Sequence, residues 1–162
     1  MDESARILEH LSRVVDPEIP VLTLRDMGIL RGVRWDEKQA QYLITISPTY
    51  VGCPAMDRME QDIREAMYVL QLPFDVETQL KPAWTTSMIT AEGRRKMEEY
   101  GIAPPVEGSA DKRVLFAEPP VVKCPRCKSK NTHMVSMHGS TACKSAYTCK
   151  DCLEPFEYFK CL

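Results

Sequence analysis

The chain has 162 residues, of which 44% are hydrophobic and 27% are charged, and its formal net charge is −2. This length fits one ordinary domain with a small additional module, and the composition is that of a soluble globular protein. No window approaches about 18 uninterrupted apolar residues, and the amino-terminal residues lack the basic start and apolar run of a secretory signal. We therefore expect a cytoplasmic protein with no membrane partner.

Charge is distributed unevenly along the chain. Residues 1–103 contain 12 Lys and Arg against 17 Asp and Glu, a net charge of −5, whereas residues 104–162 contain 9 against 6, a net charge of +3. A module that binds nucleic acid usually carries a stronger basic stripe than this. The sequence therefore predicts no nucleic-acid partner.

The first part of the chain predicts one helix and a β-hairpin. A helical repeat runs through residues 4–15, with Ser4 as N-cap and an apolar face made of Ile7, Leu8, Leu11, Val14 and Val15. Prolines at positions 17 and 20 end this helix. Residues 29–35 and 42–47 then alternate as two antiparallel strands, joined by a polar turn at residues 36–39.

A second helix is expected after the loop at residues 47–52. Pro54 suits the first helical position, which places Cys53 at or next to the N-cap. The buried stripe of this helix consists of Met56, Met59, Ile63, Met67 and Leu70. A third strand follows with alternation from Phe74 to Leu80, and then a short helix at about residues 91–100, with Thr90 as cap and Gly101 as stop.

These elements define a fold class and three segments. Residues 1–102 are expected to form an α+β domain of order α-β-β-α-β-α, a small sandwich with helices packed on one sheet. Residues 103–121 are rich in proline and predict a linker. Residues 122–162 are expected to form a small zinc-ribbon module, with strands at residues 132–137, 146–148 and 156–160.

The ribbon assignment depends on two pairs of cysteines, Cys124 with Cys127 and Cys149 with Cys152. A Cys-x-x-Cys turn lets two thiolates reach one ion, and two such turns complete the tetrahedral sulfur site that zinc favours. The 21 residues between the pairs suffice for a hairpin that returns the second turn to the first. We expect one structural Zn²⁺ on these four residues, at about 2.3 Å per Zn–S bond.

Two further cysteines in the tail, Cys143 and Cys161, have two interpretations. They are either additional metal or redox groups, or small apolar side chains that pack the module's core. His133 and His138 could replace a cysteine ligand, but two intact Cys-x-x-Cys turns make that unnecessary.

Cys53 is the sharpest candidate for chemistry in the first 100 residues. A thiol at a helix amino terminus lies near the positive end of the helix dipole and near unpaired N–H groups, and both favour the thiolate. The alternative is a buried structural cysteine. Asp16, Glu18 and Asp26 could supply oxygen ligands or orient this loop, or they could simply form turns beside Pro17 and Gly28.

Several of these segments resemble known families. The first 100 residues resemble the MIP18 family, formerly DUF59, in Asp16-Pro17-Glu18, Asp26-Met27-Gly28, Thr45-Ile46-Ser47-Pro48, Gly52-Cys53-Pro54 and Pro82-Ala83-Trp84. Ala83 departs from the family's frequent second proline. The tail resembles the family of D components of phenylacetyl-CoA epoxidases in the segments at residues 139–144, 149–152 and 154–161.

The resemblance implies a function in metal-centre maturation. Members of the MIP18 family serve iron–sulfur assembly, and their Cys-Pro cysteine, here Cys53, would handle transient iron or an iron–sulfur cluster. The resemblance of the tail implies an accessory maturation factor for the oxygenase or the reductase of a di-iron epoxidase in phenylacetate catabolism. The expected partners are these epoxidase proteins, or a second copy of the chain.

Other functions compete with this expectation. The chain could be a non-catalytic structural subunit that clamps the oxygenase, a nucleic-acid binder or a thiol enzyme. It lacks a Glu-x-x-His pair for di-iron, a dinucleotide-binding glycine motif, a phosphate-binding loop and a nucleophile elbow. We therefore expect no catalysis by this chain itself.

Overall fold

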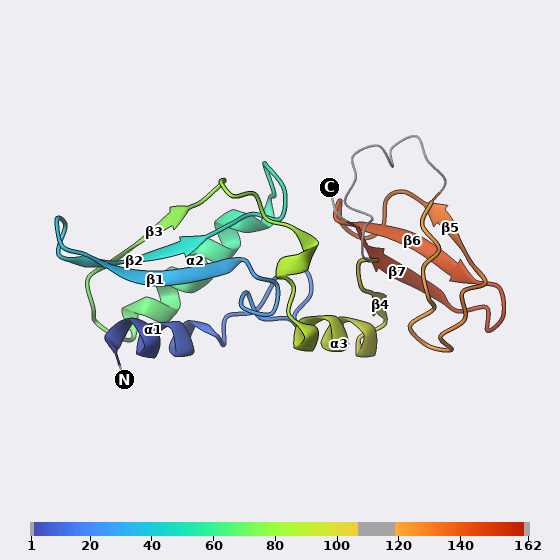
Figure 1. Cartoon of the computed structure of the whole chain (residues 1–162), viewed down its shortest axis with the longest axis horizontal. Helices are drawn as coiled ribbons and strands as arrows, with labels where there is room; N and C mark the ends of the chain where they lie inside the picture. The colour runs from blue at the N-terminus through green and yellow to red at the C-terminus, as the bar shows by residue number, and fades with distance from the viewer. Residues whose placement is uncertain (1, 107–118, 161–162) are drawn as a thin grey trace. The chain divides into compact units, whose positions relative to one another are not determined.

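A computed structural model describes residues 2–106 and 119–160 of the chain (Figure 1). The α+β class is confirmed: helices and strands alternate, and the strands form two separate sheets. The structure divides into two compact units. The first unit comprises Met1–Trp84 and Met88–Gly93, and the second comprises Thr85–Ser87 and Arg94–Leu162. No helix in the described residues is long and apolar enough to cross a membrane.

The first unit is a three-stranded sheet with two helices on one side (Figure 1). Its strands are β1 (Leu30–Asp36), β2 (Gln41–Ile46) and β3 (Phe74–Thr78), and its helices are α1 (Glu3–Leu11) and α2 (Ala55–Tyr68). β1 pairs antiparallel with β2, as the hairpin predicted, and β3 pairs parallel with β2. The fully buried core includes Ile7, Leu11, Ile29, Ile44, Ile46, Ile63 and Met67.

The first helix is shorter than the sequence predicted. It ends at Leu11, and residues 14–16 pair instead with residues 22–24: the N–H of Asp16 donates to Leu22 at 2.8 Å. This pairing leaves Val15 41% exposed, so its place on the apolar face was wrong. The expected N-cap was also wrong, because Asp2 holds that position and Ser4 lies inside the helix.

The later elements of this region follow the prediction more closely. Pro54 is the N-cap of α2, so Cys53 lies next to the cap as expected. Thr90 caps α3 (Ala91–Glu99), since its hydroxyl accepts the N–H of Gly93 at 2.9 Å. The third strand is shorter than expected, because it ends at Thr78 and leaves Leu80 54% exposed. A short 3₁₀ turn, η1 (Thr86–Met88), precedes α3.

The second unit contains a four-stranded sheet of order β4-β7-β6-β5. Its strands are β4 (Ile102–Ala103), β5 (Thr132–Ser136), β6 (Lys144–Cys149) and β7 (Pro155–Phe159). β5, β6 and β7 form the expected antiparallel ribbon, whereas β4 pairs parallel with β7 and was not expected. Its core consists of Ala103, Val122, Cys124, Tyr147, Cys149, Phe156 and Tyr158.

Candidate metal centre

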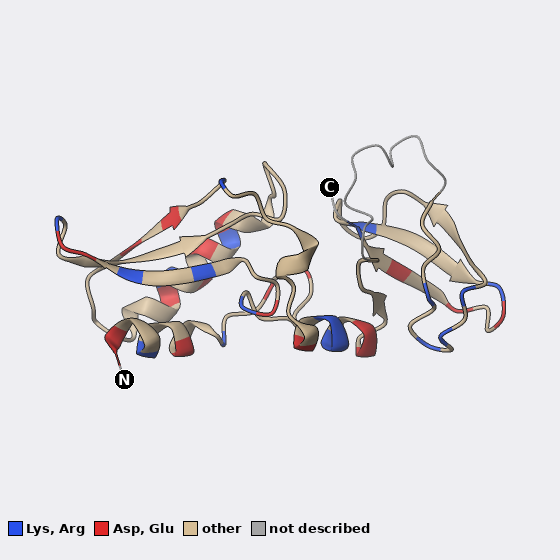
Figure 2. Ribbon diagram, viewed as in Figure 1, with Lys and Arg blue, Asp and Glu red and all other residues tan. Residues whose placement is uncertain are grey.

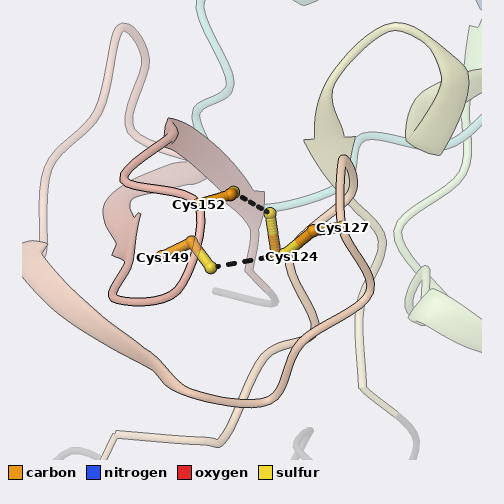
Figure 3. A group of neighbouring side chains, drawn as sticks. All are labelled: Cys124, Cys127, Cys149 and Cys152. Carbon is orange, nitrogen blue, oxygen red and sulfur yellow. Dashed lines mark hydrogen bonds between the residues drawn. The ribbon is translucent and has the colours of Figure 1, made fainter.

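The two Cys-x-x-Cys turns bring four sulfur atoms together (Figure 3). All four sulfurs lie within 4.8 Å of one another. Cys124 and Cys152 are 3.7 Å apart, and Cys127 and Cys149 are 3.5 Å apart. A tetrahedral ion with bonds of about 2.3 Å needs sulfur–sulfur edges of about 3.8 Å. The donor set and its spacing therefore fit a four-coordinate metal ion such as Zn²⁺.

Both turns have the same backbone pattern. The N–H of Cys124 donates to the carbonyl of Ser129 at 2.9 Å, and the N–H of Cys149 donates to the carbonyl of Glu154 at the same distance. Directly after the second cysteine of each turn, Lys128 and Leu153 adopt φ of 65° and 61°. This left-handed geometry turns the chain back beneath the sulfurs without a glycine.

The sulfurs do not ionise equally when no metal balances them. Backbone N–H groups of Cys152 and Asp151 lower the pKa of Cys149 to about 7 against the opposing effect of burial. The N–H of Glu154 also favours the thiolate of Cys152, but burial and the neighbouring sulfurs raise the pKa of Cys152 to about 12. Four thiolates so close together need a cation, which is the chemistry of a metal site.

Polar contacts tie the two turns to each other and to α3. Arg126 of the first turn forms an ion pair with Glu154 after the second. Asp151 accepts hydrogen bonds from the hydroxyl of Ser129 and, at 2.7 Å, from the amide of Asn131. Lys128 donates to Glu98 of α3 at 2.6 Å. These contacts hold the ligand turns in place, as outer-shell partners of metal sites usually do.

Cys143 does not belong to this group. Cys143 is buried, and its sulfur lies 3.1 Å from the hydroxyl of Thr141. Cys161 lies outside the described residues. His133 and His138 are exposed and do not belong to the four-sulfur group.

Cys53 lies on the turn between β2 and α2. Its N–H donates to the carbonyl of Tyr50 at 3.3 Å, and its own carbonyl accepts the N–H of Met56 at 3.2 Å. The side chain is half-buried. In the part of the chain that the structure describes, the ribbon cysteines alone form a group of three or more potential ligands. Cys53 is therefore a single, half-buried thiol outside any such group.

The three acidic residues flank turns of the first unit. Asp16 is buried, and its carboxylate accepts the N–H groups of Glu18 and Ile19 at 2.7 and 3.0 Å. Asp26 is buried too, and accepts the N–H of Thr23 at 3.0 Å. These bonds support a turn-forming role for both aspartates, and none of the three joins Cys53 in a ligand group within the described residues.

Sequence reasoning missed one polar group, the buried Lys144 at the start of β6. Its ammonium lies 2.9 Å from the hydroxyl of Ser140 and 3.5 Å from the carboxylate of Glu157. That carboxylate also accepts the backbone N–H of Ser140 at 2.6 Å. A charged residue beginning a short strand gave no signal of burial, because the pairing depends on β7.

Comparison with known proteins agrees with both units. Residues 4–79 match the family model described as iron–sulfur cluster assembly protein, and residues 108–160 match the PaaD zinc beta ribbon domain. A protein of Escherichia coli, described as a candidate D component of the 1,2-phenylacetyl-CoA epoxidase, is 46% identical over 153 residues, which cover 94% of this chain and 89% of that protein.

A solved structure adds a likeness in fold alone. The crystal structure of a domain of unknown function, DUF59, from Bacillus anthracis is 21% identical, with a TM-score of 0.52. The match covers 58% of this chain and 90% of that one.

Proposed function

The chain belongs to the family of 1,2-phenylacetyl-CoA epoxidase D components, and from that membership we propose that it is an accessory maturation factor of such an epoxidase. In this proposal it acts in phenylacetate catabolism in the cytoplasm and assists iron or iron–sulfur assembly in the oxygenase or its reductase. It performs no oxidation itself.

The observation that carries the proposal is the position of Cys53. The thiol is half-buried on the β2–α2 turn, in the segment that matches the iron–sulfur assembly model. A cluster needs about four protein ligands, so one thiolate holds it only briefly. Such a site suits handover, in which the acceptor protein or a second copy of this chain supplies the remaining ligands.

The ribbon has a different role in this proposal. Cys124, Cys127, Cys149 and Cys152 would hold one Zn²⁺, and four protein ligands leave no open position for a substrate. The ion would stabilise the fold of the ribbon and so present a fixed surface to the partner. Asp16, Glu18 and Asp26 would shape the turns near the start of the first unit.

Reconstitution tests the maturation function. Iron-free oxygenase and reductase are incubated with iron, sulfide and either wild-type protein, Cys53→Ser or Val51→Ala, and iron content is measured for each component. Val51 is 85% exposed in the same loop, so its variant controls for loop surface. We expect Cys53→Ser to lose the acceleration and Val51→Ala to keep it.

The competing function is a structural subunit that clamps the oxygenase. Asp16 and Asp26 favour it, because their carboxylates accept backbone N–H bonds of turns. In the described residues, no group of three or more potential ligands includes Cys53. A clamp tolerates Cys53→Ser. Equal rates and extents of iron loading with and without the protein would exclude maturation and leave the clamp as the better account.

A further inference from the structure

Leu153, which follows the second Cys-x-x-Cys turn, has an unfavourable backbone conformation and an unfavourable exposure. Leu153 has a φ of 61° and its side chain is 74% exposed. A left-handed backbone favours glycine or asparagine, and a γ-branched apolar side chain there gains nothing from burial. The equivalent residue of the first turn, Lys128, uses its side chain: its ammonium binds Glu98 and the carbonyl of Pro125, the latter at 2.8 Å. Leu153 has no comparable use within the described part of the chain.

Three exposed lysines without an ion-pair partner in the described residues lie on or next to the two ligand turns. Figure 2 shows basic residues on the loops at the metal end of the ribbon. The N–H of Lys150 donates to the carbonyl of Asn131 at 2.8 Å, which places Lys150 close to the backbone next to Lys130. The third, Lys123, directly precedes the ligand Cys124. Within the residues that the structure describes, no ion pair or side-chain hydrogen bond engages these three ammonium groups.

The two carboxylates of the second ligand turn, Asp151 and Glu154, are already engaged. Asp151 is held by Ser129 and Asn131, and Glu154 pairs with Arg126. The metal end of the ribbon therefore combines an exposed apolar side chain with exposed lysines that have no acidic partner in the described residues. Apolar anchors ringed by polar groups are typical of protein interfaces.

We propose that Leu153 is the anchor of a protein-docking surface, with Lys123, Lys130 and Lys150 as its charged rim. The occupant is a protein surface with an apolar pocket edged by carboxylates. This inference rests on the proposed function, which places that surface on an epoxidase component. Nucleic acid fits less well, because none of the ribbon's exposed large hydrophobic side chains is aromatic within the described residues, and acidic groups interrupt the basic loops.

Substitution of Leu153 by asparagine gives two readouts of opposite sign. Asparagine tolerates left-handed geometry, so the ribbon's thermal midpoint should rise by about 2–4 °C in the zinc-loaded full chain. Binding to the co-purified epoxidase components, measured by calorimetry, should weaken at least about tenfold, because a buried leucine side chain is lost from the interface. A residue with only a structural role would move stability and binding in the same direction.

Charge variants test the rim. The triple variant Lys123→Glu, Lys130→Glu and Lys150→Glu should bind weakly, and its remaining association should strengthen as salt is added, because three attractions to carboxylates become repulsions. Lys38→Glu and Val135→Thr serve as controls, since Lys38 belongs to the first unit and Val135 is 62% exposed on β5.

The possible outcomes test the docking surface separately from the proposed maturation function. If the wild type binds the epoxidase components and Leu153→Asn binds them with the same affinity, the docking surface is overturned and the proposed function stays intact. Loss of self-association in place of partner binding overturns the assignment to an epoxidase component. Absence of any wild-type complex overturns the proposed function and the docking surface together.

Discussion

Substitution of Cys124 by serine should unfold the ribbon and leave the first unit folded. Cys124 and Cys149 are two of the four candidate ligands, and both are fully buried members of the ribbon's hydrophobic core. The remaining core consists of three aromatic rings with Val122 and Ala103. The substitution therefore removes a ligand and disturbs the core at one point.

The magnitudes indicate that the metal decides the outcome. Burial of a Val- to Phe-sized side chain contributes about 1.5–3 kcal/mol, so the other core residues together supply roughly 10 kcal/mol at most. A structural Zn²⁺ contributes about 10–16 kcal/mol at pH 7. A module this small cannot stay folded after it loses a free-energy contribution as large as that of its whole apolar core.

Cys143→Ser provides the matched control. Cys143 is 6% exposed in the same module, but it is not part of the four-sulfur group. Serine retains a partner for the hydroxyl of Thr141, so we expect a loss of only about 1–2 kcal/mol and an intact ribbon.

The two units can be observed separately. Trp35 and Trp84 are the only tryptophans of the chain and both belong to the first unit, so tryptophan fluorescence follows that unit alone. Limited proteolysis with mass spectrometry, together with metal analysis, follows the ribbon. A Cys124→Ser protein that keeps one zinc per chain and a protease-resistant ribbon would refute this reasoning, as would equal unfolding by Cys143→Ser.

Three further predictions concern the turns and the buried ion pair. Gly28→Ala should destabilise the first unit by about 2–4 kcal/mol in urea titrations, because the φ of Gly28 is +67° and the added Cβ would lie 2.5 Å from the carbonyl oxygen of Met88. Gly32→Ala is the control: a Cβ at Gly32 would have no atom within 4 Å, so this substitution should cause no measurable loss of stability. Glu157→Gln should cost about 2–3 kcal/mol at pH 7. Burial opposes ionisation, but the contacts with Ser140 and the neighbouring ammonium lower the pKa of Glu157. The stabilisation is therefore present above about pH 4.3 and is lost as pH falls through the lowered pKa. The unfolding free energies of variant and wild type should converge at low pH, and a difference that stays constant with pH would contradict the ion pair. Asp16→Ala should destabilise by about 1–3 kcal/mol while Asp16→Asn keeps the turn and iron loading, whereas loss of iron loading in Asp16→Asn would point to a ligand role.

The sequence predicted what depends on local spacing. Alternating residues located β1 and β2, and the 3.6-residue period located α2, because each pattern reflects the face that a neighbouring layer covers. The four-sulfur group was predictable because two Cys-x-x-Cys turns in one small module have few other uses.

Contacts between distant segments were not predictable in the same way. The α1 helix stops at Leu11 because residues 14–16 find a partner at residues 22–24, which helical periodicity does not encode. β4 has two residues and exists only through β7. Lys128 and Leu153 adopt left-handed geometry without the glycine that would have signalled it.

The parallel pairing of β4 with β7 has a consequence for how the chain responds to cleavage. Ile102 and Ala103 precede residues 107–118, yet they lie in register with Glu157 and Tyr158, near the end of the chain. The hydroxyl of Tyr158 also accepts the N–H of Val106 at 3.3 Å. A single cut within residues 107–118 would therefore leave two fragments joined by sheet hydrogen bonds and a shared core. Such a nicked protein should migrate as two bands under denaturing conditions and as one particle under native ones.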